Sequence, residues 1–183
     1  MPHLPSLPEK ATLLDVFRRF PETSRALIEY HERLLRGPSP LRVAERELIA
    51  AYVSGLNQCH YCHGVHTVAA EALGVAPGTL EQLLNDPDSA DIDAKLRPIL
   101  HYVRKLTLSP ARMTSADAEA VYAAGWDEQA LHDAVSICAL FNFMNRLVEG
   151  LGIDADKAYF DEAGRRLFQG GYRSILTHLG LAD

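Results

Sequence analysis

The sequence predicts an all-α fold. Apolar residues recur at helical spacing through most of the 183 residues, and glycine or proline separates these stretches. Short runs of β-branched residues lie inside longer helical patterns, so no strand is expected. An apolar share of 48% and a charged share of 23% are typical of a globular chain with a substantial core.

Proline and glycine divide the first half of the chain into helices. Residues 1–10 carry three prolines, and we expect an extended arm there. Asn57 is placed to cap the helix that bears three of the eight histidines, and Gly55 to end the helix before it. Helices are expected over residues 11–20, 22–36, 39–54 and 57–73.

The second half of the chain follows the same pattern. Thr79 and Gln82 have the spacing of a capping box at the start of a short helix, and 87–93 is a polar loop. Thr114 and Asp127 are placed as further N-caps. The most apolar helix, 127–149, is expected at the centre of the bundle or in a subunit interface. Helices are expected over residues 95–108, 114–124, 127–149, 154–168 and 172–179.

We expect a single domain over residues 1–183, with a helical extension (1–37), a core redox helical hairpin (38–75) and the remaining helices (76–183). The net charge is −6 and basic residues are spread out, so neither nucleic acid nor a membrane span is expected. The N-terminus shows no basic region followed by an apolar one, so we expect a cytoplasmic protein. Disulfides in that compartment are usually transient and catalytic.

Cysteine and histidine concentrate between residues 57 and 66, which hold two of the three cysteines and three of the eight histidines. On a helix, Cys59, Cys62 and His66 are spaced i, i+3, i+7 and share one face. The two sulfurs can therefore close a disulfide, and the His66 ring can reach a thiol. Cys59 falls in the first turn, where unpaired N–H groups and the helix dipole favour a thiolate. A thiolate attacks peroxides and disulfides.

A carboxylate on the preceding helix can complete this site. Glu47 lies twelve residues before Cys59. If the two helices fold back on each other, Glu47 meets His66 and orients its ring so that the other nitrogen faces the thiol. Glu45 is the competing carboxylate, but it lies about 200° away around the helix, so only one of the two faces the site.

Three other interpretations of these residues remain open. The Cys-x-x-Cys-His pattern is that of a haem attachment site, which normally requires export and a second axial ligand. The two thiols with His66 and Glu47 could hold zinc, although structural zinc sites usually gather ligands from separated segments. The thiols could also be inert core residues. Their polar neighbours Gln58, His60 and His63 argue against an inert core.

Polar groups outside the motif allow less specific assignments. Cys138 lies in an apolar run and is expected to be a packed thiol. Asn142, Asn145 and Arg146 are polar groups on the same apolar helix. They can cap carbonyls, bind a partner subunit or line the site, and the sequence does not separate these roles.

The spacing of Glu47, Cys59, Cys62 and His66 resembles that of the alkylhydroperoxidase D-like (AhpD-like) family, within the carboxymuconolactone decarboxylase superfamily. The match covers roughly residues 40–75. It is most similar to the peroxidase-related branch, whose members commonly show Asn-x-Cys-x-Tyr-Cys. The segments with Asn-Phe-Met-Asn-Arg and Gly-Leu-Gly further along the chain are also similar to that branch.

The resemblance implies an all-helical homo-oligomer, commonly a trimer or hexamer. It implies a thiol peroxidase in which Cys62 attacks the hydroperoxide, Cys59 is the disulfide partner, and His66 and Glu47 relay protons. A dithiol or lipoyl-type reductant would reset the site, with no cofactor or metal. Tyr61 stands where the well-studied enzyme has histidine, and we hypothesise that its hydroxyl contributes to the site.

Two other functions are considered. A lactone decarboxylase is disfavoured, because that branch of the superfamily lacks the Cys-x-x-Cys pair. A non-catalytic redox sensor or metal-binding protein that uses the same thiols is the alternative from another class.

Overall fold

The computed structural model describes residues 1–182, which form ten α-helices and one short 3-10 helix without a β-strand. The predicted all-α class is therefore confirmed. The first five helices are α1 (Leu13–Arg19), α2 (Pro21–Arg36), α3 (Val43–Leu56), α4 (His60–Ala72) and α5 (Thr79–Asn85). They are followed by α6 (Arg97–Leu108), η1 (Pro110–Arg112), α7 (Ser115–Ala123), α8 (Glu128–Gly150), α9 (Lys157–Gly170) and α10 (Arg173–Leu179).

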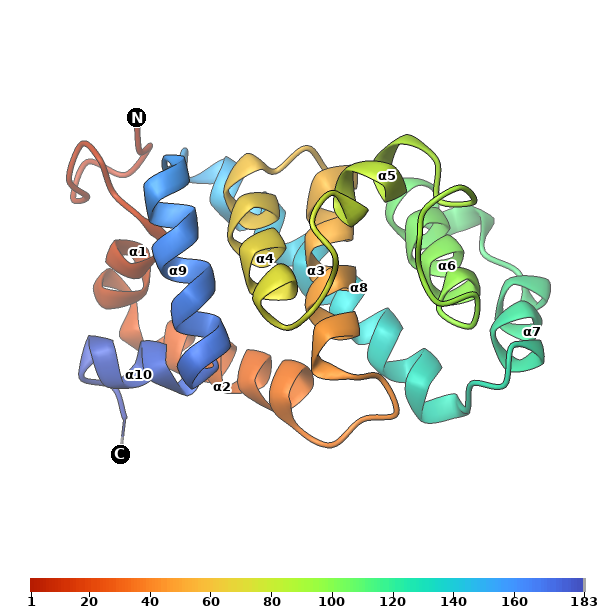
Figure 1. Cartoon of the computed structure of the whole chain (residues 1–183). Helices are drawn as coiled ribbons and strands as arrows, with labels where there is room; N and C mark the ends of the chain where they lie inside the picture. Colours follow the sequence, from red (N-terminus) through yellow and green to blue (C-terminus); the bar gives the residue numbers. More distant parts are fainter. Residues whose placement is uncertain (183) are drawn as a thin grey trace.

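The helices form an elongated bundle (Figure 1). Helices α3, α4 and α8 lie in the middle, α5 to α7 lie at one end, and α1, α2, α9 and α10 gather at the other end with both chain termini. Helices α3 and α4 form an antiparallel hairpin with the most extensive contact of any helix pair, and α9 packs along the other side of α4. No helix in residues 1–182 has the length and hydropathy needed to cross a bilayer.

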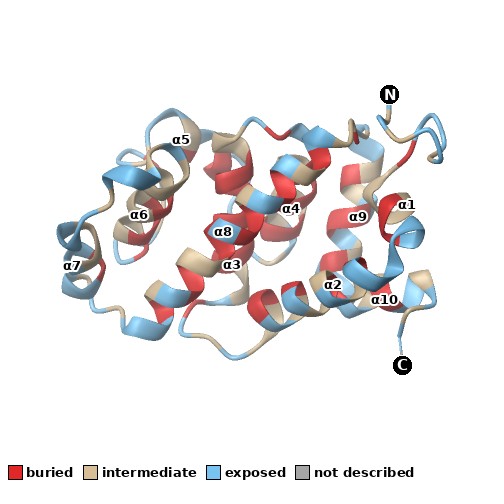
Figure 2. Cartoon of the chain, turned by 180° about the vertical axis from the view of Figure 1, so that it is seen from behind, coloured by how far each residue is buried: buried red, intermediate tan, exposed pale blue. Residues whose placement is uncertain are grey.

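Helix α3 is the most enclosed element. All its residues from Glu45 to Ser54 are buried, including the ionisable side chains of Arg46 and Glu47. Small residues such as Ala50 and Ala51 let neighbouring helices approach it closely. Helix α8, which the sequence placed at the centre or in an interface, packs along α3 and α6 but leaves Phe143 half exposed. Figure 2 shows the buried residues concentrated along these middle helices.

The turn between α3 and α4 differs from the prediction. Helix α3 continues through Gly55 to Leu56, and Cys59, not Asn57, is the N-cap of α4. Gly55 lies inside the helix, where it makes room for the Leu84 side chain, since a Cβ there would lie 2.8 Å from it. The reversal instead uses Gln58, whose φ of 58° is left-handed, a strained conformation for a residue with a side chain.

Of the other predicted N-caps, two are confirmed and one is wrong. Thr114 caps α7 in a capping box with Asp117, and the Asp127 carboxylate accepts a hydrogen bond of 2.8 Å from the N–H of Ala130, as predicted. The capping box at Thr79 is wrong. Gly78, with a φ of 84°, is the N-cap of α5, and Thr79 is its buried first residue.

Candidate active site

The two motif cysteines lie at the start of α4. Cys59 is the N-cap residue, Cys62 lies in the first turn, and both are buried free thiols. The Cys62 thiol stabilises the Cys59 thiolate. Together with the backbone N–H of Cys62, it outweighs burial and lowers the pKa of Cys59. The same interaction with Cys59, together with burial, raises the pKa of Cys62 well above its ordinary value. When one of the two thiols is ionised, Cys59 is therefore the thiolate and Cys62 keeps its proton.

Cys62 borders a small, partly open cavity of about 70 Å³. The cavity lies at the end of the bundle where α1, α2, α4, α8, α9 and α10 meet, and most of its wall is apolar. Besides Cys62, the lining includes the side chains of His31, His66 and Arg166 and the rings of Tyr61, Tyr159 and Tyr172. Cys59 does not line the cavity and is fully buried. The apolar wall includes Phe17, Ile28, Phe141, Met144 and Leu167.

A buried carboxylate holds His66 from behind. Nδ1 of His66 lies 2.7 Å from Oε2 of Glu47, whose side chain is fully buried. A carboxylate at Nδ1 fixes the proton on that nitrogen, which leaves Nε2 with a lone pair. The edge of Phe141 packs on the ring, with the centroids 4.6 Å apart. The hairpin of α3 and α4 thus brings together the pair that the sequence predicted.

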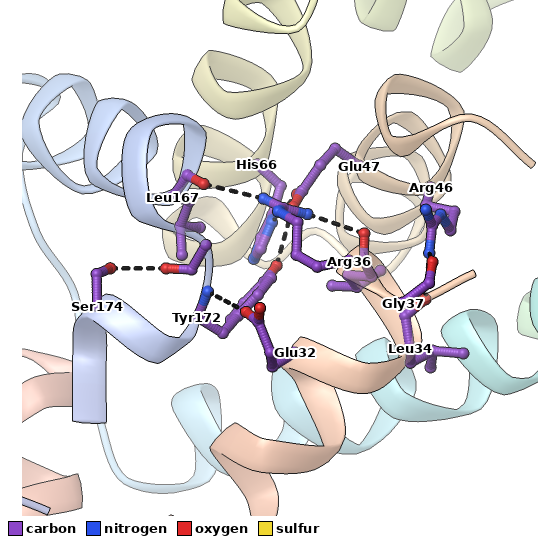
Figure 3. Close-up of polar contacts among 12 residues, drawn as sticks. Glu32, Leu34, Arg36, Gly37, Arg46, Glu47, His66, Leu167, Tyr172 and Ser174 are labelled. Atoms are coloured by element: carbon purple, nitrogen blue, oxygen red, sulfur yellow. Dashed lines mark hydrogen bonds and ion pairs between the residues drawn. The ribbon is translucent and has the colours of Figure 1, made fainter. Parts of the chain in front are cut away.

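Two side chains that the sequence did not predict complete this cluster. The Arg36 guanidinium lies 2.7 Å from Oε1 of Glu47, and the Tyr172 hydroxyl donates to the same oxygen over 3.1 Å. Arg36 also donates to the Leu167 carbonyl, which ties α2 to α9. Figure 3 shows Glu47 surrounded by His66, Arg36 and Tyr172. We call these four residues the carboxylate cluster.

The carboxylate cluster keeps Glu47 ionised. Burial on its own would raise the pKa of Glu47, but the charge and hydrogen bond of His66, followed by those of Arg36, outweigh burial and lower the pKa to about 2. Arg36 therefore compensates a carboxylate that would otherwise be very unfavourable in this position. The carboxylate serves as a fixed anchor for His66 at any ordinary pH.

The second acidic residue of α3 has a different environment. Glu45 accepts from the backbone N–H of Arg42 over 2.8 Å and from Nε of Arg42 over 2.9 Å, at the N-terminus of the helix. Only Glu47 reaches His66, as the rotation of about 200° between the two positions predicts.

The comparison with known proteins agrees with this arrangement. The sequence pattern of the carboxymuconolactone decarboxylase family matches residues 21–104. An uncharacterized peroxidase-related protein from Silicibacter sp. TM1040 has a similar solved structure. It has a TM-score of 0.76 and 28% identity, and the match covers 84% of this chain and 80% of that chain. A solved structure from Ralstonia eutropha JMP134, described as an alkylhydroperoxidase AhpD core and an uncharacterized peroxidase-related protein, has a TM-score of 0.74 and 27% identity. That match covers 82% of this chain and 78% of the other.

The chain is thus similar to the carboxymuconolactone decarboxylase family over residues 21–104, and its fold is AhpD-like. No protein with a curated description matches it. The matched segment contains Glu47, both motif cysteines and His66, whereas α1, α8, α9 and α10 lie outside it. In this AhpD-like protein, much of the cavity wall and Tyr172 of the carboxylate cluster therefore come from the remainder of the chain.

Tyr61 lies directly before Cys62, and its ring lines the cavity. Its hydroxyl donates to the Tyr159 hydroxyl over 2.8 Å and accepts from the N–H of Leu13 over 3.3 Å. Burial, followed by the proximity of Tyr159, raises the pKa of Tyr61 well above its ordinary value. The hydroxyl thus connects α4 to α1 and α9.

The polar residues of α8 brace the turn before Cys59. The Asn57 side chain donates to Oδ1 of Asn142 over 3.1 Å and to Oδ1 of Asn145 over 2.9 Å. Asn145 donates in turn to the Ser54 hydroxyl over 3.0 Å, and Arg146 donates to the Asn142 carbonyl over 2.7 Å. Among the roles left open by the sequence, Asn142 and Asn145 therefore hold the strained turn in place.

The remaining thiol and histidines of the motif region are structural in their contacts. Cys138 is fully buried, 3.2 Å from the Thr107 hydroxyl, as expected of a packed thiol. His63 bonds the Ala51 carbonyl over 2.9 Å, and His60 lies at the surface, 3.3 Å from Asp154. Within residues 1–182, no group of three or more His, Cys, Asp or Glu side chains is arranged to hold a metal ion.

Proposed function

We propose that this AhpD-like protein is a thiol peroxidase that reduces hydroperoxides through a Cys59–Cys62 dithiol–disulfide cycle. The observation that carries the proposal is the shared cavity. The Cys62 thiol and the His66 ring both line this cavity. Glu47 binds Nδ1 of His66, which leaves Nε2 free to act as a base. Two peroxidase-related proteins with the same fold support the assignment.

The raised pKa of Cys62 explains why the site needs a base. In the proposed first step, Nε2 of His66 takes the Cys62 proton, and the thiolate attacks the terminal oxygen of the hydroperoxide. The O–O bond breaks, Cys62 becomes a sulfenic acid, and the departing alkoxide takes the proton back from His66 as it becomes an alcohol. Glu47 stabilises the imidazolium while it exists.

The lowered pKa of Cys59 serves the second step. Its sulfur attacks the sulfenic acid sulfur of Cys62, hydroxide leaves, and water forms with the remaining thiol proton. The two thiols and one hydroperoxide have then become a disulfide, an alcohol and water. An external dithiol restores the thiols by exchange.

The test is a count of thiols combined with an assay of turnover. Reduced protein is treated with one equivalent of tert-butyl hydroperoxide, and free thiols are counted before and after. We expect three thiols per chain to fall to one, Cys138, and we expect steady consumption of peroxide when a dithiol is supplied. Loss of two thiols without turnover would indicate a redox sensor. Retention of all three thiols would overturn the proposal.

A further inference from the structure

A second histidine, His31, lines the cavity together with Cys62 and His66. His31 comes from α2, and only 5% of the residue is exposed. Its Nδ1 lies 2.8 Å from the carbonyl oxygen of Leu27, one turn earlier on the same helix. A carbonyl oxygen can only accept, so Nδ1 carries the proton and Nε2 carries the lone pair.

No hydrogen bond to Nε2 of His31 is present among residues 1–182, and this nitrogen is not one of the fully enclosed atoms that lack a partner, so it keeps some accessible surface. The ring is held between Phe141, with centroids 6.0 Å apart in an edge-on contact, and Tyr172, with centroids 5.2 Å apart. Burial is the largest influence on this ring and lowers the pKa of His31 to about 4, so it is uncharged near neutral pH. The cavity therefore contains a neutral, fixed acceptor in apolar surroundings.

The two histidines of the cavity differ in the group that holds Nδ1. Glu47, a carboxylate, holds His66, and it stabilises the charged ring that forms when His66 takes a proton. A neutral carbonyl holds His31 and gives a charged ring no comparable support. Both rings pack on Phe141 and Tyr172 and therefore lie in one pocket. The surroundings stabilise a protonated ring at His66 but not at His31.

Because Nε2 of His31 accepts no hydrogen bond from the described residues, a ligand in the cavity that donates an O–H can pair with it. Arg166 also lines the cavity, but its guanidinium is paired with Glu162. The ligand that suits this cavity is therefore uncharged, compact and apolar, with one hydroxyl group at the end that faces the histidines. A hydroperoxide of a small alkyl group meets these requirements, and so does the alcohol formed from it.

We propose that Nε2 of His31 accepts the O–H of the bound hydroperoxide and thereby directs its terminal oxygen toward Cys62. This inference rests on the proposed peroxidase function and adds a substrate-binding residue to it. The terminal oxygen carries the hydrogen and is the atom transferred to sulfur. The hydrogen bond to His31 can therefore persist through the first step, with the sulfenic acid as its donor. His31 neither gains nor loses a proton.

The first arm of the test measures binding without chemistry. Reduced protein with ¹⁵N-labelled histidine is titrated with tert-butyl alcohol and, separately, with tert-butyl methyl ether, which has a similar apolar body but no O–H. His31→Phe identifies the His31 signals. We expect the alcohol to shift the Nε2 resonance of His31 and the ether to leave it in place. Equal shifts with both compounds, or none with the alcohol, would overturn the inference.

The second arm compares turnover in two variants. His31→Phe keeps an aromatic ring of similar size without an acceptor, and His31→Gln supplies an acceptor oxygen. We expect kcat/KM for tert-butyl hydroperoxide to fall about tenfold in His31→Phe, the equivalent of one hydrogen bond, with kcat within about threefold. His31→Gln should recover part of the loss. Unchanged kcat/KM in His31→Phe would exclude the role.

The two arms separate this inference from the peroxidase proposal. If the wild-type protein does not turn over peroxide, the proposed function fails, while the alcohol titration still decides whether Nε2 of His31 binds a hydroxyl group. Thermal unfolding checks that His31→Phe remains folded. The backbone N–H of residue 31 still bonds the Leu27 carbonyl within α2 in this variant.

Discussion

The thiol side and the carboxylate side of the site are built in different ways. Cys59 and Cys62 lie within one turn at the start of α4, and they share protons between two sulfurs. The carboxylate cluster takes Arg36 from α2, Glu47 from α3, His66 from α4 and Tyr172 from the residue before α10. It holds an ion pair between the fully buried Glu47 and the partly buried Arg36. Changes to the thiols should therefore alter chemistry with little effect on folding, whereas changes to the carboxylate cluster should alter both.

The largest expected effect is on the thiol side. Cys62→Ser should lower turnover at least about a thousandfold, because the atom that attacks the peroxide is gone. Cys59→Ser should also stop turnover, but it should still consume one equivalent of hydroperoxide and leave a sulfenic acid on Cys62. Trapping with dimedone followed by mass spectrometry locates that acid. Both variants should unfold within about 1 kcal/mol of the wild-type protein.

The assignment of the two thiols depends on this pair of variants. A sulfenic acid on Cys59 in the Cys62→Ser variant, formed as rapidly as the one expected on Cys62, would reverse their roles. It would also mean that the buried position of Cys59, away from the cavity, does not limit its reaction.

On the carboxylate side, Glu47→Gln should reduce stability by about 3 kcal/mol, because it leaves the Arg36 charge, whose side chain is only 14% exposed, without its carboxylate partner. Glu45→Gln is the matched control on the same helix. Its partner Arg42 has a side chain that is 74% exposed, so the expected loss is at most about 1 kcal/mol. Chemical denaturation measures both. Adding Arg36→Met to Glu47→Gln should recover part of the stability, since the unpaired charge is removed.

Equal losses in Glu47→Gln and Glu45→Gln would contradict the claim that folding and chemistry are linked specifically at Glu47. If Glu47→Gln is too unstable to purify, the double variant with Arg36→Met still provides the comparison.

The pH dependence of stability distinguishes the environments of His31 and Glu47. His31 has a folded pKa of about 4, below its unfolded value of about 6.5, so its contribution of about 3 kcal/mol is present above pH 6.5 and is lost as pH falls to 4. Glu47 has a folded pKa of about 2, below its unfolded value of about 4.3. Its contribution of about 3 kcal/mol is lost between about pH 4.5 and 2.

Urea unfolding at a series of pH values measures these slopes. The free energy of unfolding of His31→Phe relative to that of the wild-type protein should rise as pH falls from 6.5 to 4. It should be constant above pH 6.5. A constant difference across that window would show that His31 titrates normally when the protein is folded.

The smallest expected effect comes from two tyrosine hydroxyls. Tyr172→Phe removes a hydrogen bond to the buried Glu47 carboxylate and should reduce stability by about 2 kcal/mol. Tyr61→Phe removes a bond between neutral groups and should reduce it by about 1 kcal/mol. Thermal unfolding ranks the two. Unchanged peroxide turnover in Tyr61→Phe would also remove its hydroxyl from the mechanism.

Local patterns predicted much of the fold and half of the site. Helical spacing located the helices, and Thr114 and Asp127 cap theirs as predicted. The caps at Asn57 and Thr79 were wrong for a tertiary reason. The Asn57 side chain is bound by asparagines of α8, and the chain reverses instead at Gln58, a choice that no rule of local spacing favours. His31 left a weak signal as a polar residue on the apolar face of α2, in line with Ile28 and Leu35 one turn on either side.

The sequence by itself determined the spacing of Cys59, Cys62 and His66 and that only one of Glu45 and Glu47 can face the site. These follow from the pitch of a helix and the closeness of two adjacent helices, which are local geometry. Only the tertiary structure decided that Arg36 and Tyr172 surround Glu47 and that Cys62, not Cys59, borders the cavity. A buried carboxylate needs compensating partners, but any arginine or tyrosine in the chain could supply them. The packing of α2, α9 and α10 selects which ones do.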